Sequence, residues 1–236
     1  MTKYNHTEEM HNMQSPLILI PYFLELGDIK SVVDIGCGLG TFLRAFKEKG
    51  INDIIGIDGK WCKKELLFKN IEPVNFIEKD LEEEIKLERK FDLAISLEVA
   101  EHLSPQRADS FVKDLCNLSD NIIFSAALPY QGGDNHLNEK PLSYWIKIFE
   151  KNGFDCFDTI RPKIWGDDRI FWWYRQNIVF FKRRSGKSIS QLSPIIDVVH
   201  PELLKTVVDF KDKNATKRHL KLLLKSILFK LNGSKN

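Results

Sequence analysis

Short apolar runs and helically spaced apolar residues alternate along the middle of the chain. The apolar runs are rich in β-branched residues and predict strands at 31–36, 53–58, 74–80, 91–97 and 121–127. Between them, helical spacing predicts helices from residue 41 through Phe46, over 63–71 and near 105–118. Alternating strands and helices are typical of a parallel sheet covered on both faces by crossover helices.

The chain after Pro141 completes this pattern. Residues 142–153 have helical spacing and stop at Gly153, and strands are expected at 154–161 and 177–184. We therefore predict an α/β fold with a Rossmann-like, doubly wound, mostly parallel sheet of seven strands, whose final strand is antiparallel.

Three segments are expected. Residues 1–30 form an N-terminal segment, 31–184 the core, and 185–236 a Ser-rich linker with a C-terminal helical extension. The extension ends in RHLKLLLKSILFKL, an amphipathic basic helix. We expect this helix to pack on the core or on a second subunit of a homodimer, the alternative being contact with anionic lipid or nucleic acid.

Bulk composition narrows the function classes. The chain has 236 residues, of which 43% are apolar, enough for one large core, and its formal charge of +2 does not favour a nucleic-acid or membrane partner. The first apolar run, 17–26, contains Pro21 and Glu25 and resembles neither a signal peptide nor a spanning helix. The cysteines lack zinc spacing, which favours a reducing cytoplasm; they are Cys37, Cys62, Cys116 and Cys156.

A glycine-rich turn joins the first strand to the first helix. Such a turn presents backbone N–H groups to a ligand, although a tight turn without any ligand is the alternative. The G-x-G-x-x-G spacing of dinucleotide-binding loops is not met, because Thr41 stands at its last position. The candidate residues here are Asp34, Gly36, Gly38 and Gly40.

Two more acidic residues end neighbouring strands. Asp58 is placed to accept both hydroxyls of a ribose, and Asp80 to accept an adenine amino group while the backbone N–H of Leu81 meets a ring nitrogen. Each aspartate alone is as well explained by a turn. Around one glycine turn, at the carboxyl edge of one sheet, the three acids predict a nucleoside-sized crevice.

The stretch DIGCGLG closely resembles the first motif of class I methyltransferases that use S-adenosylmethionine (SAM), and the resemblance covers roughly residues 30–183. It implies SAM rather than NAD as the cofactor. To the residues above we add Leu97, at the end of the fourth strand, and Asn12. Asn12 belongs to an N-terminal segment that is expected to close over the cofactor as a lid, a disordered tail being the alternative.

A second cluster follows the fourth strand. Glu98, Glu101 and His102 are spaced i, i+3 and i+4, so on a helical turn they point the same way. Two carboxylates so close repel each other unless a cation lies between them, and a divalent ion with a histidine ligand meets that need. His136, in a glycine-flanked loop after the fifth strand, is a further candidate.

The pattern E-x-x-E-H with a distant His resembles the metal site of small-RNA 2′-O-methyltransferases and of ubiquinone-pathway O-methyltransferases. The resemblance implies Glu98, Glu101, His102 and His136 as ligands of Mg²⁺ or Mn²⁺. Without metal, either histidine is a candidate general base, because an alcohol must lose its proton to attack a methyl sulfonium. The predicted catalytic residues are His102, His136 and Glu98.

Longer stretches, among them SLEVAEHL, FSAALPYQGGDNHLNE and RPKIWGDDRIFWWYRQN, resemble bacterial methyltransferases associated with polysaccharide biosynthesis. This implies an acceptor that is a sugar, or a sugar-phosphate or nucleotide-linked precursor, of a capsule or other surface polysaccharide. Aromatic rings suit sugar faces and arginines suit phosphates, although packing at the sheet edge is the alternative. The residues are Trp165, Trp172, Trp173, Tyr174, Arg161, Arg169, Arg175, Gln176 and Asn177.

Two other functions compete with sugar O-methylation. The metal pattern favours an RNA-end 2′-O-methyltransferase, but the balanced charge disfavours it, because RNA phosphates need a basic face. A non-catalytic SAM-binding regulatory module would require the second cluster to be purely structural.

Overall fold

The structure is a computed structural model that describes residues 12–186, 197–208, 216, 220 and 223–224. It divides into two compact units, one ending at His200 and the other starting at Pro201. Within the second unit the described helix is α8, Pro201–Val208. The basic side chains predicted for the C-terminal helix lie outside the described residues.

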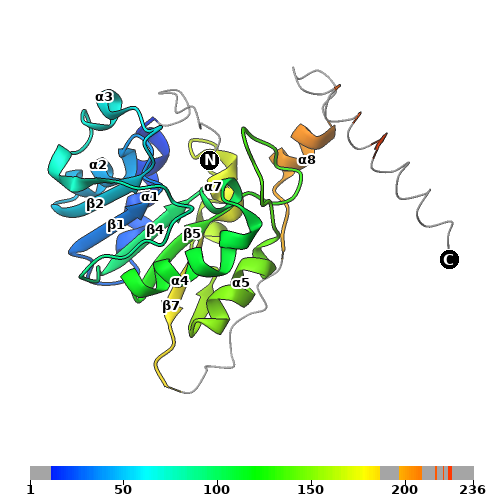
Figure 1. The fold of residues 1–236 in the computed structure, drawn as a ribbon. Helices are drawn as coiled ribbons and strands as arrows, with labels where there is room; N and C mark the ends of the chain where they lie inside the picture. Colours follow the sequence, from blue (N-terminus) through cyan, green and yellow to red (C-terminus); the bar gives the residue numbers. More distant parts are fainter. Residues whose placement is uncertain (1–11, 187–196, 209–215, 217–219, 221–222, 225–236) are drawn as a thin grey trace. The chain divides into compact units, whose positions relative to one another are not determined.

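A seven-stranded sheet in the order β3-β2-β1-β4-β5-β7-β6 forms the centre of the first unit (Figure 1). The strands β1 to β5 run parallel, while β7 pairs antiparallel with both β5 and β6. The predicted fold class is confirmed. The strands are β1 Ser31–Ile35, β2 Asp53–Asp58, β3 Phe76–Glu78, β4 Leu93–Leu97, β5 Asn121–Ser125, β6 Phe154–Phe157 and β7 Val179–Arg183.

The described part of this unit has seven α-helices beside the sheet: α1 Gln14–Leu24, α2 Thr41–Glu48, α3 Lys64–Leu67, α4 Ala108–Leu118, α5 Leu142–Lys151, α6 Arg161–Ile164 and α7 Trp172–Asn177. Three short 3₁₀ turns cover Pro73–Asn75, Ala100–His102 and Pro105–Arg107. None of the helices that the structure describes is long and apolar enough to cross a membrane.

Side chains of alternate strand residues pack into two hydrophobic layers, one on each face of the sheet. One layer joins Val33 and Phe124 to side chains of α4 and α5, such as Phe111 and Phe149. The other joins residues one position away, such as Val32 and Ile123, to side chains of α1 and α2. This period of two buries both faces of the strands, as the continuous apolar runs predict.

Helix α1 extends the core beyond its predicted start at residue 31. Leu19, Ile20 and Phe23 are fully buried, and the Phe23 ring stacks on Phe42 of α2 with 6.3 Å between centroids. From residue 14 onward the predicted N-terminal segment therefore contributes a helix to the core, and its closure over the cofactor as a lid stays a prediction. Residues 1–11, the other part of that prediction, lie outside the described residues. The unit also continues to His200, past the predicted boundary at 184.

Several predicted elements are longer than those in the structure. The strand predicted over 154–161 ends at Phe157, because Arg161 starts α6 and forms a two-pronged ion pair with Asp158. The strand predicted over 74–80 keeps only Phe76–Glu78, since Pro73 opens a 3₁₀ turn. The helix predicted over 63–71 is one turn, α3.

Candidate active site

A cavity of about 420 Å³ lies at the carboxyl ends of β1, β2 and β4. Its lining comes from the start of α1, the glycine turn, the turn after β4, the loop 131–136 and the segment 171–174. The sheet order reverses at β1, which lies between β2 and β4. Ligands of open α/β sheets bind at such a switch point, so topology places a binding site here.

The glycine turn forms one end of the cavity. Gly36, Gly38 and Gly40 have φ values of 83°, 52° and 73°, in the left-handed region that favours glycine. The backbone N–H groups of Gly36 and Cys37 both donate to the Ile57 carbonyl at 2.8 and 3.2 Å, which fixes the turn against β2. Gly36 and Cys37 line the cavity, whereas Gly38 and Gly40 support the turn from outside its lining.

Gly36→Ala is expected to destabilise the chain by about 2 kcal/mol or more, because left-handed φ strain adds to a steric clash. A Cβ at Gly36 would lie 2.3 Å from Cγ2 of Val99. Chemical denaturation measures the effect, and Gly166→Ala is the matched control because nothing lies within 4 Å of its Cβ position. Equal free energies of unfolding for the two variants would contradict the predicted clash.

Asp58 closes the turn from β2. Its Oδ2 accepts the Gly38 N–H at 2.8 Å and its Oδ1 the Gly59 N–H at 2.6 Å, and the Trp61 side chain adds a third hydrogen bond. Burial nonetheless raises the pKa of Asp58 to about 6. Burial, and then the charge of Asp58, raises the pKa of Asp34 well above its usual range. Both carboxyl groups line the cavity, where a cationic ligand would stabilise them.

The other predicted cofactor residues divide into two groups. Leu81, Leu97 and Asn12 line the cavity. Asp80 does not, and its Oδ1 accepts the Glu82 backbone N–H at 3.0 Å, as in an ordinary Asx turn. An adenine contact by Asp80 therefore stays a prediction.

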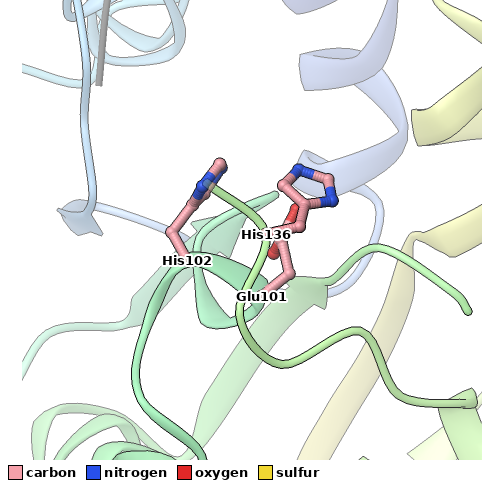
Figure 2. A group of neighbouring side chains, drawn as sticks. All are labelled: Glu101, His102 and His136. Carbon is pink, nitrogen blue, oxygen red and sulfur yellow. The ribbon is translucent and has the colours of Figure 1, made fainter. Parts of the chain in front are cut away.

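Glu101, His102 and His136 come together near the middle of the cavity. Each offers a ligand atom, and these three atoms lie within 4.8 Å of one another. Figure 2 shows Glu101 and His102 on the turn after β4 and His136 on the loop that faces it. The two imidazole rings meet edge to face, with 4.7 Å between centroids.

The electrostatics of this cluster fit a cation. Glu101 is fully buried, and neither carboxylate oxygen has a hydrogen-bond partner among the described residues. Burial, then the charge of Glu98, raises its pKa well above the usual range, and nearby backbone N–H groups offset only part of this rise. Burial lowers the pKa of His102 to about 4, so its ring is neutral at neutral pH. A carboxylate with neutral imidazoles is a donor set that divalent metals accept.

Glu98, the fourth predicted ligand, is not among the three residues whose ligand atoms lie within 4.8 Å of one another, and its role as a metal ligand stays a prediction. Its backbone has φ 56°, so 98–102 is not the helical turn that the spacing predicted. Its Oε1 accepts the Asn177 side-chain amide at 3.0 Å and its Oε2 that of Gln131 at 2.8 Å. Glu98 still lines the cavity, but these two amides hold its carboxylate in a separate network.

His136 is held by Glu139, three residues further on. The His136 Nδ1 lies 3.0 Å from Oε1 of Glu139, and Glu139 also accepts the backbone N–H groups of Gly132 and Tyr130 at 2.8 and 3.0 Å. Contact of Nδ1 with a carboxylate orients the ring and leaves Nε2 as the nitrogen for a metal or a proton.

The aromatic segment also lines the cavity, and its Tyr174 ring meets Phe42 edge to face with 5.6 Å between centroids, but the predicted arginines are not lining residues. Phe171, Trp172, Trp173 and Tyr174 are lining residues. Arg161 is paired with Asp158, Arg169 is paired with Asp167, and Arg175 donates to the Trp165 carbonyl. The predicted phosphate contacts by these arginines therefore have no place in the cavity.

Residues 10–120 match the sequence model of a family described as a methyltransferase domain. A magnesium protoporphyrin IX methyltransferase from Synechocystis PCC 6803, solved with bound SAH, superposes with a TM-score of 0.54 at 20% identity, over 78% of this chain and 90% of that one. A sugar N-methyltransferase from Streptoalloteichus gives 0.57 at 11% identity, over 78% and 97%. The chain has a methyltransferase fold.

The methyltransferase domain of bacterial CtHen1-C is a further match to this methyltransferase fold, with a TM-score of 0.53 at 20% identity, over 74% of this chain and 100% of that one. None of the curated proteins matches the sequence.

Sequence reasoning missed two residues at this site of the methyltransferase fold, Trp61, which bonds Asp58, and Gln131, which holds Glu98. Asn177 was a candidate for the acceptor, but its hydrogen bond to Glu98 was not predicted. Trp61 had a local signal, an aromatic residue just after the acidic strand end in IDGKW. The two amide contacts had none, since they reach Glu98 from 33 and 79 residues away.

Proposed function

We propose that this protein is a SAM-dependent O-methyltransferase that acts in the cytoplasm on a hydroxyl of a sugar precursor of a surface polysaccharide. One observation carries the proposal. A single cavity is lined by the glycine turn with Asp58, by the Glu101, His102 and His136 cluster, and by the aromatic segment 171–174. Cofactor and acceptor would thus meet without an intervening wall.

The cofactor end fits SAM. SAM supplies a methyl group on a sulfonium, a good leaving group that needs no covalent enzyme intermediate. The buried carboxyls of Asp34 and Asp58 suit a ligand that carries ribose hydroxyls and positive charge. Phe42 and Trp61 add apolar surface to the same end.

The acceptor end has groups that remove a proton. A neutral imidazole is the form that accepts a proton, and His102 is neutral because its pKa is about 4. His136, oriented by Glu139, is the stronger candidate base, because a nearby carboxylate stabilises the imidazolium that forms. Glu101, His102 and His136 would hold Mg²⁺ or Mn²⁺, which lowers the pKa of a bound hydroxyl.

SAM affinity is expected to fall with pH below about 6. Asp58 must be ionised to accept two hydroxyl hydrogen bonds, and its pKa is raised to about 6 by burial. Below that pKa, affinity should drop by up to about tenfold per pH unit. Titration calorimetry between about pH 5 and about pH 7 measures this, and Asp58→Asn should show a flat profile. A wild-type Kd that is constant over this range would refute the ribose role of Asp58.

The overall proposal is tested by following SAH formation by mass spectrometry. The purified chain is incubated with SAM, with or without Mn²⁺ after chelation, and with separate pools of monosaccharides, sugar phosphates, nucleotide-linked sugars and short RNA. Turnover with a sugar pool supports the proposal. Turnover with RNA alone would replace it by the RNA-end alternative, and failure to bind SAM would sink it.

A further inference from the structure

The cavity has an unusual charge pattern. None of the described residues that line it is Lys or Arg, although these make up 35 of the 236 residues of the chain. Its lining does contain acids: Asp34, Asp58, Glu98, Glu101 and Asp134. The pattern is therefore a property of the site rather than of the composition.

Among the hydrogen bonds and ion pairs that the described residues make, none joins a Lys or Arg to Asp34, Asp58, Glu98 or Glu101. The Glu98 carboxylate is held by the side-chain amides of Asn177 and Gln131, and neither Glu101 carboxylate oxygen has a hydrogen-bond partner among the described residues. The Nδ1 of His136 lies 3.0 Å from Oε1 of Glu139. Of the nearby arginines, Arg161 and Arg169 are paired with Asp158 and Asp167, and Arg175, which does not line the cavity, donates to the Trp165 carbonyl.

A phosphate group would be poorly accommodated here. A multiply charged anion loses hydration when it enters a cavity, and proteins compensate with Arg, Lys or a bound cation. One divalent ion on Glu101 would leave only a single net positive charge there, beside the other carboxyls. Phosphorylated acceptors would therefore meet repulsion as well as desolvation.

The side of the cavity lined by 131–136 and 171–174, called the acceptor end here, offers good contacts to an uncharged ring. The side chains of Phe171, Trp172 and Trp173 are partly exposed at the cavity, and the Phe171 and Trp173 rings stack with 4.5 Å between centroids. Aromatic faces pack against the C–H faces of sugars. Gln131, Asn135 and the Glu98 carboxylate add polar atoms for hydroxyl or amino groups.

We propose that the acceptor end takes a sugar ring that carries no negative charge and excludes sugar phosphates and nucleotide-linked sugars. This inference rests on the proposed function and narrows it. It places the methylation after glycosyl transfer or dephosphorylation, since one of these reaction classes must release the ring from its phosphate.

The first test uses tryptophan fluorescence and requires no acceptor. Caesium, iodide and acrylamide quench exposed tryptophans as a cation, an anion and a neutral probe. The fluorescence of Trp172 and Trp173 is obtained as the difference between the wild type and the double variant Trp172→Phe, Trp173→Phe. After normalisation to acrylamide, the quenching constant of this difference signal should be at least about threefold higher for caesium than for iodide, because the acidic cavity repels the anion. Trp165→Phe is the control, since Trp165 packs on His200 outside the lining. Equal or stronger quenching by iodide would overturn the proposal.

The second test measures SAH formation with matched pairs, each a methyl glycoside and its 6-phosphate. The unphosphorylated member should show a kcat/KM at least about tenfold higher, a difference of about 1.4 kcal/mol. A higher kcat/KM for the phosphorylated member of a pair would overturn the inference. Amino glycosides in the same panel distinguish O-methylation from N-methylation of a ring without negative charge. Fragmentation in the mass spectrometer shows whether the new methyl group is on oxygen or on nitrogen.

The two tests fail in distinguishable ways. A chain that binds no SAM sinks the proposed function, while the caesium-to-iodide ratio still decides the charge of the cavity. Methyl found on nitrogen refutes O-methylation and leaves the exclusion of phosphate supported. When no pair turns over, the quenching ratio alone decides.

Discussion

The Asp58→Ala variant is expected to bind SAM at least about 100-fold more weakly than the wild-type chain, because two charge-assisted hydrogen bonds to ribose hydroxyls contribute about 3 kcal/mol or more together. Titration calorimetry with SAM and SAH measures the change. Asp53→Ala is the matched control: Asp53 lies at the other end of β2, exposed, and pairs only with Arg89 among the described residues.

Folding must be followed in the same variant. Loss of the Asp58 carboxylate also leaves the Gly38 and Gly59 N–H groups without their acceptor, which costs about 1–3 kcal/mol of stability for each buried group. Near-ultraviolet circular dichroism and the Tm separate unfolding from a lost ligand contact. A folded variant that binds SAM like the wild type would remove Asp58 from the cofactor site.

His136→Ala should lower kcat by about 100- to 10,000-fold, the usual contribution of a positioned base. Its SAM affinity should stay within about twofold, because the ring lies with the acceptor groups rather than at the glycine turn. Mn²⁺ titration by electron paramagnetic resonance should show one site in the wild type and none in the variant. His200→Ala is the control, a buried histidine outside the lining.

The combination of results assigns the role of His136. Lost turnover together with lost Mn²⁺ binding supports a metal-assisted mechanism. Lost turnover in a wild type that never binds Mn²⁺ makes His136 a general base without metal. Unchanged turnover would show that the Glu101, His102 and His136 cluster is structural.

The sheet and the glycine turn at its carboxyl edge could be predicted because their signals are local. Apolar runs mark the strands, and a glycine turn after Asp34 can hardly be anything but a tight connection with left-handed residues. Parallel strands then bring their carboxyl ends to one edge, which is why Asp58 meets Gly38 across 20 residues of chain.

Glu98 shows where local reasoning stops. Its spacing to Glu101 and His102 predicts one helical face, but a single left-handed residue turns its side chain elsewhere. The amides of Gln131 and Asn177 that hold it come from distant segments. Spacing along the sequence contains no information about such partners.

The partners of two arginines, by contrast, could have been predicted from the sequence, because they are only a few residues away. Arg161 follows Asp158 by three residues and Arg169 follows Asp167 by two, and each pair forms in the structure. An aspartate this close competes directly with any external phosphate. A basic residue next to a local acid is therefore weak support for an anion site.

The distribution of the cavity-lining residues along the sequence also suggests a way to re-engineer this protein. The residues proposed to hold the cofactor stand mostly on strand ends of the sheet, whereas most residues proposed to face the acceptor fall in two short stretches, 131–136 and 171–174. Exchange of these ten residues would alter acceptor choice while the strands that form the cofactor crevice keep their sequence. The two specificities are thus separately accessible to grafting and to directed evolution.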